Sequence, residues 1–514
     1  MRNGGRIMRK KFRKEITEMK RKISLLLAVM MLLSVMVIFS SCGNDKGDAA
    51  ATTTVTTTSP NGGTSNTEEN LFEDIPTGSY GGYTFQFLNN TSNYAITTIV
   101  PDETTDTVDA AMFARNAYVK EKLAIDIIEV RQTYDEVRST MSSLTSSNDF
   151  EYDAVYNEVH LQTPLAQSGT YLEVDDLDSY INLSKPWWFT DAMESISIDG
   201  NGFELFGDLQ LMYYDSIWGM TFNQQDFLDN KQSFPYDLVR SGDWTLEELE
   251  KLMKATYQKP GAEHYAMASH KDFISAMIAA CDFALVTQDD DDVLKVFEDE
   301  ERFVEVYTSI MTLFYSSTGY EKMNYVVPDY NASSYISGQW ASDTDTWSGK
   351  FPLGKSTFMA GTIGDIRAVR SADFQYGIIP FPKYDTDQGQ YVSWVYRGAA
   401  SLGVPATNPN VEQTCVILEN LAAYSYKLVK HEYYDVVVQG RTVRDNDSIE
   451  MLDIIFGHTD LGVTYLGIDT TYRLGLSDQI RKSMSDNVTE IMADIDGIMG
   501  SVATNVESLI EAYK

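Results

Sequence analysis

Segments that alternate between strand-like and helix-like patterns restrict the fold of this chain more than any other feature. "YTFQFLNN" (Tyr83–Asn90) alternates apolar and polar residues as a strand does, whereas the following "TVDAAMFARNAYVKEKL" has apolar residues at helical spacing. "AIDIIEV" (Ala124–Val130) is a second strand pattern, and the short apolar run "YDAVY" (Tyr152–Tyr156) follows another helix-like stretch. Strands that alternate with helices predict an α/β fold, with a largely parallel sheet covered by helices on both faces.

The size and charge of the chain limit its organisation and its partners. Its 514 residues are 43% hydrophobic and 12% aromatic, which indicates a globular protein too long for one ordinary core. We therefore expect two or more lobes. The formal net charge of −35 favours solubility, and it makes nucleic acid and anionic lipid poor partners, so we expect neither to bind the folded body.

The N-terminal residues have the pattern of an export signal. A basic "MKRK" (Met19–Lys22) precedes 19 residues without a charge, and "FSSC" (Phe39–Cys42) then resembles a bacterial lipoprotein box. We expect residues 1–41 to be a signal peptide and Cys42 to be lipidated; the alternative is an uncleaved membrane anchor. Residues 42–70 are rich in Thr and Gly and lack large apolar side chains, which predicts a flexible tether outside the cell membrane of a bacterium.

One stretch matches a nucleotide-binding pattern. "GKFPLGKS" (Gly349–Ser356) satisfies G-x-x-x-x-G-K-[ST], but no apolar strand precedes it and Pro352 removes a backbone donor. The residues that follow are interrupted by glycine and favour a strand, whereas a phosphate loop opens a helix. An exported chain is also separated from cytoplasmic nucleotide. We therefore expect no nucleotide, and no other cofactor.

Motifs for catalysis or for a metal site are absent from the sequence. The five His residues are scattered, no His-Glu-x-x-His or Gly-x-Ser-x-Gly motif occurs, and the acidic run "TQDDDD" lacks the glycine of a calcium loop. We expect no catalytic residue and no metal. Two alternatives stay open: a lipid-anchored glycoside hydrolase, which needs a pair of carboxylates that no motif singles out, and a surface glycan-adhesion module. Cys281 and Cys415 are expected to be buried thiols, with a disulfide as the alternative.

Several segments occur in the order found in extracellular solute-binding proteins of bacterial ABC importers, and the chain resembles their sugar-type family 1. "EYDAVYNEVHLQTPLAQSGTYLEVDDL", "SIWGMTFNQQDF" and "DWTLEELEKLMKA" resemble the family's second-strand segment, its crossover strand and its T-W-D-E-L helix. "KSTFMAGTIGDI", "YGIIPFPKYD" and "WVYRGAASLGVPATNPNVEQTCVILENLA" resemble later motifs, so the likeness covers most of residues 80–425. Asp365 and Ile366 stand where the family has a Trp, which puts that sugar-stacking contact in doubt.

The resemblance implies a two-lobed, periplasmic-binding-protein-like α/β fold with a cleft between the lobes. The N-terminal lobe would comprise residues 71–213 plus 362–398, and the C-terminal lobe residues 214–361 plus 399–514. Crossovers would fall near Tyr213–Trp218, Met359–Gly364 and Gly398–Leu402. Glycines at such places absorb backbone rotation, and the expected hinge positions are Gly219, Gly361, Gly364 and Gly398.

A sugar site needs aromatic plates for the ring faces and polar side chains for the hydroxyls. The resemblance places candidate contacts at one rim of the cleft, at a hinge and on the return segments: Tyr156, Asn157, Glu158, Tyr214, Asp215, Trp218, Asp365, Trp394, Tyr396 and Arg397. Trp340 and Trp347 join them because they lie in a polar, Ser- and Asp-rich stretch. The alternative for each is core packing or a surface ion pair, and core packing is favoured for Trp187 and Trp188.

These patterns together predict a membrane-anchored extracellular solute-binding protein. We expect it to capture a carbohydrate or oligosaccharide, to close on it, and to deliver it to the permease subunits of an ABC importer. We expect it to act as a monomer without a catalytic step.

Overall fold

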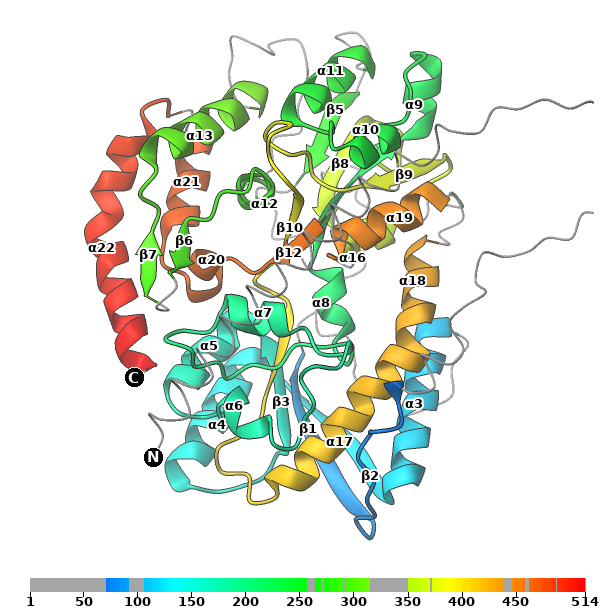
Figure 1. Cartoon of the computed structure of the whole chain (residues 1–514), viewed down its shortest axis with the longest axis vertical. Helices are drawn as coiled ribbons and strands as arrows, with labels where there is room; N and C mark the ends of the chain where they lie inside the picture. Colours follow the sequence, from blue (N-terminus) through cyan, green and yellow to red (C-terminus); the bar gives the residue numbers. More distant parts are fainter. Residues whose placement is uncertain are drawn as a thin grey trace, which may run out of the picture. The chain divides into compact units, whose positions relative to one another are not determined.

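The computed structural model describes residues 71–91, 106–256, 264–269, 272–289, 293–314, 350–369, 372–438, 446–457, 462–486 and 488–513 (Figure 1). They belong to one compact unit, Asn66–Lys514, which is distinct from Met1–Ser65. Cys42, Trp340 and Trp347 lie outside the described residues. Within the described ranges, every helix is too short or too polar to cross a bilayer.

The first sheet has the strand order β11-β3-β1-β2. The strands β1 (Tyr83–Asn90), β2 (Ile125–Gln132) and β3 (Ala154–Glu158) are parallel, and β11 (Ala400–Gly403) runs antiparallel to β3. The strand-and-helix alternation of the sequence is therefore confirmed. Helices α3 (Thr107–Leu123), α4 (Tyr134–Ser147) and α5 (Val159–Gln167) connect or follow these strands, and α17 (Val411–Tyr424) packs against α3.

Alternating side chains of β1 enter two cores on opposite faces of this sheet. Phe85 and Phe87 point to a core that includes residues of α3 and α17, whereas Leu88 points to a smaller core with Val137 of α4 and Leu165 of α5. Because both faces bury apolar side chains, the sheet is covered on both sides, as the sequence predicts.

The second sheet has the strand order β5-β8-β4-β9. The strand β4 (Trp218–Asn223) is antiparallel to β8 (Ser356–Thr362) and to β9 (Tyr376–Ile379), and β5 (Tyr265–Ser269) is parallel to β8. The helices of this part include α9 (Gln224–Asp229), α10 (Tyr236–Ser241), α11 (Leu246–Thr256), α16 (Ile363–Ala368) and α19 (Asn446–Ile455). Ser356 thus begins a buried strand, which agrees with the rejection of the phosphate-loop pattern.

A third group of elements extends the second core. The strand β10 (Tyr391–Trp394) pairs in parallel with β12 (Gly462–Tyr465), and β6 (Val286–Gln288) pairs with β7 (Leu294–Val296). The helices are α12 (Phe273–Ala280), α13 (Glu300–Phe314), α20 (Ile468–Tyr472), α21 (Leu476–Ser485) and α22 (Ile491–Ala512). The buried face of α22, with Ile491, Ile495, Val502 and Leu509, packs into this core.

The two sheets group the chain differently from the expected boundaries. The strand β9 lies in the second sheet, whereas the resemblance predicts residues 362–398 in the N-terminal lobe. The strand β11 lies in the first sheet and α17 packs on α3, whereas the resemblance predicts residues 399–514 in the C-terminal lobe. The reason is local pairing: all four residues of β9 are buried beside β4, where Met220 faces Ile379.

Within the described ranges, the chain passes between the two sheets at three places. The first passage is α8 (Leu211–Asp215), directly before β4, and the second joins β10 to β11. The third is a continuous helical run in which a π-helical turn, η3 (Ser425–Val429), joins α17 to α18 (Lys430–Val438). The remaining short helices are α6 (Val174–Leu177) and α7 (Thr190–Ser195). Met359–Gly364, an expected crossover, instead forms the end of β8 and the start of α16 within the second sheet.

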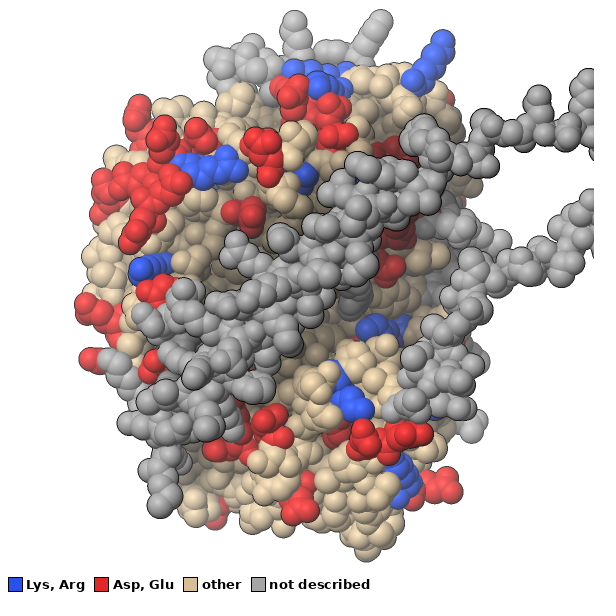
Figure 2. Space-filling view, viewed as in Figure 1, with Lys and Arg blue, Asp and Glu red and all other residues tan. Residues whose placement is uncertain are grey.

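The buried side chains outside the expected site also follow the sequence analysis. Trp187 and Trp188 are in the core, and both indole N–H groups donate to the carboxylate of Glu419, at 2.9 and 2.8 Å. Cys281 and Cys415 are buried free thiols. The charge of −35 is visible on the surface, because acidic side chains are spread over the face in view and basic ones are few (Figure 2).

Candidate ligand-binding site

Four of the expected aromatic contacts are core residues. Tyr156 is 2% exposed and stacks on Phe87 with ring centroids 5.2 Å apart. Trp218 and Trp394 pack against each other at 5.8 Å in the second core. Tyr214 is buried and donates its hydroxyl hydrogen to Asp208 at 2.5 Å. In this conformation, these four rings are covered by protein.

Three of the expected polar contacts are engaged in buried hydrogen bonds. The side-chain oxygen of Asn157 accepts from Asn90 Nδ2 at 3.2 Å. Asp215 accepts from the hydroxyl of Tyr433 at 2.6 Å and forms an ion pair with Arg367. Asp365 accepts from the backbone N–H and the hydroxyl of Thr362, which is the N-cap residue of α16. Burial raises the pKa of Asp365 to about 7. The hydrogen bonds from Thr362 lower this pKa, and the negative charge of Asp215 raises it.

The remaining expected contacts, Glu158, Tyr396 and Arg397, lie beside His160, and Arg473 is near enough for its charge to act on all four. The sequence analysis points to neither His160 nor Arg473. We call these five residues the junction cluster. Glu158 ends β3, His160 lies in the first turn of α5, Tyr396 and Arg397 lie on the passage from β10 to β11, and Arg473 follows α20. The cluster therefore combines side chains from the first sheet, the second core and a crossover between them.

Backbone hydrogen bonds fix the passage that carries Tyr396 and Arg397. The N–H of Val395 donates to Tyr465 at 2.9 Å, and the N–H of Tyr396 donates to Ser216 at 2.8 Å. The next residue is Gly398, where an added Cβ would lie 2.6 Å from the ring of Tyr396 and 3.5 Å from Glu158 Oε2. Gly398 thus allows the ring of Tyr396 and the carboxylate of Glu158 to approach the backbone closely.

His160 is held in one neutral form. Its Nδ1 lies 2.9 Å from the carbonyl oxygen of Arg397, and because a carbonyl only accepts, Nδ1 carries the proton. Burial lowers the pKa of His160 to about 4, and the positive charges of Arg473 and Arg397 add to this effect against the bond to the carbonyl. The Nε2 atom of the neutral ring is then an acceptor at neutral pH.

Arg473 is placed by the packing of α20 against α5 (Figure 1). It is an exposed residue in the left-handed backbone region, with φ 54°. Partial burial lowers the pKa of Arg473, and the neighbouring positive charge of Arg397 lowers it further, although Asp478, Tyr396 and Glu158 oppose this. Arg397 and Arg473 therefore influence each other electrostatically across the junction.

The chemistry of the junction cluster suits a polyhydroxylated ligand. Glu158 and His160 Nε2 are acceptors, the two guanidinium groups are donors, and Tyr396 provides an aromatic ring. Tyr396 and Trp394 pack edge to face at 5.9 Å, which orients the tyrosine ring. Of the expected contacts, Glu158, Tyr396 and Arg397 are partly exposed in the described part of the chain.

The four expected hinge glycines lie at different places. Gly219 of β4 is paired directly with Gly361 of β8, inside the second sheet. Gly364 lies in α16, where an added Cβ would be 3.3 Å from the carbonyl oxygen of Asp215. Gly398 lies on the passage from β10 to β11. Gly364 and Gly398 are therefore next to passages between the sheets, whereas Gly219 and Gly361 face each other in neighbouring strands.

Comparisons with solved structures identify the fold. The chain matches UgpB from Mycobacterium tuberculosis, solved with glycerophosphocholine, with a TM-score of 0.54 at 14% identity over 84% of this chain and 100% of that one. It matches the cyclic alpha-maltosyl-1,6-maltose binding protein from Arthrobacter globiformis with a TM-score of 0.54 at 11% identity, over 83% and 100% of the two chains. The chain has the two-lobed fold of ABC solute-binding proteins.

A third solute-binding protein, the GacH receptor of Streptomyces glaucescens, was solved unliganded and with acarbose. It matches with a TM-score of 0.51 at 15% identity, over 84% of this chain and 100% of that one. No protein-family model matches the chain, and no curated protein matches it. At these identities the solute-binding fold is what the structures share.

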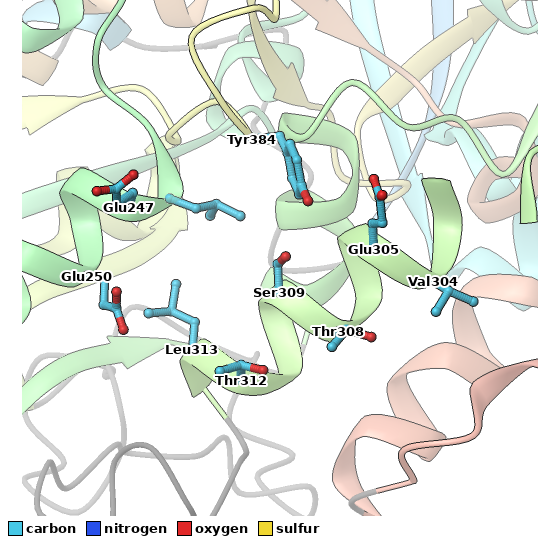
Figure 3. A pocket seen from close by; sticks show the side chains of 10 residues that line it. Glu247, Glu250, Val304, Glu305, Thr308, Ser309, Thr312, Leu313 and Tyr384 are labelled. Atoms are coloured by element: carbon cyan, nitrogen blue, oxygen red, sulfur yellow. The ribbon is translucent and has the colours of Figure 1, made fainter. Parts of the chain in front are cut away.

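A separate pocket of about 620 Å³ lies between α11 and α13 of the solute-binding fold (Figure 3). Its carboxylates already have partners on their own helices: Glu247 pairs with Lys251, Glu250 with Lys254, and Glu305 with Arg302. No expected ligand contact lines it. We therefore place the candidate site at the junction cluster.

Proposed function

We propose that the protein is an extracytoplasmic solute-binding protein that captures a saccharide between its two lobes and delivers it to the permease of an ABC importer. The observation that carries this proposal is the match to the full length of solute-binding proteins over more than four fifths of this chain. The proteins it resembles include receptors for acarbose and a cyclic maltosaccharide.

The junction cluster supplies the chemistry for capture. Tyr396 offers a ring face to a pyranose, while Glu158, Arg397 and Arg473 offer hydrogen bonds to hydroxyl groups. The lobes move about the passages next to Gly364 and Gly398, and closing brings together groups that different lobes contribute. The protein binds without cleaving, and Cys42 carries the lipid that keeps it on the outer face of the membrane.

A saccharide panel tests capture and the absence of catalysis together. The full-length protein is incubated with neutral and acidic oligosaccharides, and its melting temperature and the products are measured. We expect at least one saccharide to raise the melting temperature without appearance of shorter sugars. Release of shortened sugars by pure protein would support the glycoside hydrolase alternative instead, and binding without compaction in solution scattering would support the adhesion alternative.

A matched pair of variants tests the site. We expect Glu158→Gln to weaken binding of the saccharide found in the panel, because it removes a charged acceptor from the junction cluster. Glu247→Gln, in the pocket between α11 and α13, is the control and should bind normally. The site assignment fails if Glu247→Gln weakens binding and Glu158→Gln does not.

The lipid anchor is tested separately in cells. Cys42→Ser should abolish incorporation of labelled fatty acid and release the protein from the membrane fraction. Incorporation at the wild-type level in the variant would contradict lipidation of Cys42.

A further inference from the structure

Arginines in the described part of this acidic chain have partners, with two exceptions. The partnered residues, each followed by a group that it contacts, are Arg115 (Ser425), Arg131 (the carbonyl of Asn90), Arg138 (Asp135), Arg240 (Glu450), Arg302 (Glu305), Arg367 (Asp215) and Arg481 (Asp272). The exceptions are Arg397 and Arg473. Neither guanidinium has a hydrogen bond or an ion pair within the described ranges, and Nε of Arg397 is buried without a partner.

Both exceptions lie in the junction cluster. The chain has 75 acidic residues against 40 basic ones, so carboxylates for pairing are abundant. Two like charges that act on each other without a bound carboxylate are unfavourable, and burial increases that cost. Of the nearby carboxylates, Asp478 is bound by Arg481.

Arg473 is one of six non-glycine residues in the described part of the chain with a positive φ. A residue with a Cβ in the left-handed region is disfavoured, and helix ends that need this conformation usually have Gly or Asn. Arg473 adopts it at the end of α20, with φ 54° and ψ 47°. Strained positions of this kind are concentrated at functional sites.

We propose that Arg397 and Arg473 bind an oxyanion of the ligand, so that the saccharide carries a carboxylate, phosphate or sulfate group. This inference rests on the proposed function and narrows its substrate class. Guanidinium groups bind such anions through two parallel N–H donors, and two of them at one place supply the charge that an anion needs. Tyr396, next to Arg397 in the chain, would then contact the sugar ring.

Matched ligands that differ only in charge test the proposal. We would titrate the full-length protein calorimetrically with oligogalacturonates against their methyl esters, with N-acetylgalactosamine 6-sulfate against N-acetylgalactosamine, and with glucose 1-phosphate against glucose. We expect one of the anionic members to bind and its neutral counterpart to bind at least about tenfold more weakly. The pair that discriminates identifies the oxyanion as carboxylate, sulfate or phosphate.

Variants of the two arginines connect binding to the site. We expect Arg473→Gln and Arg397→Gln each to lower the affinity for the anionic ligand by about tenfold or more. Arg138 is an exposed residue on α4, and Arg138→Gln should leave the affinity unchanged. Arg473 is exposed, so its variant should keep the melting temperature of the wild type even if Arg397→Gln is destabilised. Arg473→Lys should recover part of the affinity, because it restores the charge but not the two parallel donors.

The outcomes separate this inference from the proposed function. Tight binding of neutral saccharides that neither glutamine variant changes would overturn the oxyanion site and leave saccharide capture intact. Binding of no saccharide of either kind would overturn the proposed function, and the oxyanion site with it.

Discussion

The hydroxyl of Tyr433 donates a hydrogen bond to Asp215 at 2.6 Å, although 218 residues separate the two in the chain. Tyr433 lies on α18 and is 1% exposed, and Asp215 ends α8, directly before the second sheet. The bond therefore joins two of the three passages between the sheets. Arg367 of α16 forms an ion pair with the same carboxylate, so three elements meet at one buried charge.

Removing this hydroxyl should destabilise the fold. We expect Tyr433→Phe to lower the free energy of unfolding by about 1–3 kcal/mol, because a buried hydrogen bond to a charged acceptor is lost. Urea denaturation measures the change. Tyr134→Phe removes the hydroxyl of a 46% exposed tyrosine and is the control, with an expected change within about 0.5 kcal/mol. Equal free energies of unfolding for the two variants would show that the bond from Tyr433 to Asp215 does not stabilise the fold.

Glu419 should be among the most sensitive polar positions of the first core. Its carboxylate accepts from the indoles of Trp187 and Trp188 and from the backbone N–H of Asn182. We expect Glu419→Ala to lower the free energy of unfolding by about 3 kcal/mol or more, because two buried indole donors and one backbone N–H lose their acceptor. Glu412→Ala, an exposed residue on the same helix, should have little effect in the same urea titration. A small effect of Glu419→Ala would mean that water replaces the carboxylate.

Stability should fall as the pH rises from about 4 to about 8. Burial raises the pKa of Glu204 to about 8, whereas an exposed Glu has a pKa of about 4.3. Between these values the folded state holds a proton that the unfolded state has lost, so raising the pH favours unfolding. Glu204→Gln stays neutral and should flatten this part of the stability profile. The change in stability is measured by the urea midpoints of the wild type and of Glu204→Gln at about pH 5 and pH 7. An equal shift of the midpoint in both proteins would rule out a contribution from Glu204.

Two glycines should respond to alanine in opposite directions. At Gly462, an added Cβ would lie 2.2 Å from the carbonyl oxygen of Ile454, so we expect Gly462→Ala to cost about 1–3 kcal/mol. At Gly497, inside α22, an added Cβ meets nothing within 4 Å, and Gly497→Ala should stabilise by about 0.5–1 kcal/mol. Thermal unfolding compares the two variants. Destabilisation by Gly497→Ala would indicate that α22 does not expose that position.

The parts of the fold that depend on local pattern could be predicted from the sequence. The alternation in Tyr83–Asn90 predicts β1, and the apolar run Tyr152–Tyr156 predicts the strand β3. The assignment of segments to lobes could not be predicted in the same way. A short apolar run such as Tyr376–Ile379 has no feature that specifies which strand it pairs with, because pairing depends on residues far away in the chain.

The candidate site, too, could be predicted from the sequence only in part. Resemblance to a family points to Glu158, Tyr396 and Arg397 of the junction cluster, but it does not distinguish an exposed aromatic ring from a buried one, so it also points to Trp218 and Trp394. His160 lies two residues after β3, and residues just beyond the carboxyl end of a strand often contact a ligand. Its position in the sequence was therefore a usable signal. Arg473 has no signal in the sequence, because the packing of α20 against α5 brings it to the junction.

The helical run from Val411 to Val438 has a mechanical consequence. Its first part packs against α3 beside the first sheet, its last part contacts α16 beside the second, and the π-helical turn between them is anchored by a 2.8 Å bond from Arg115 to Ser425. A rotation of one sheet against the other would bend this helical run. Because helices kink most readily at π-helical turns, Ser425–Val429 is where we expect the bend to fall.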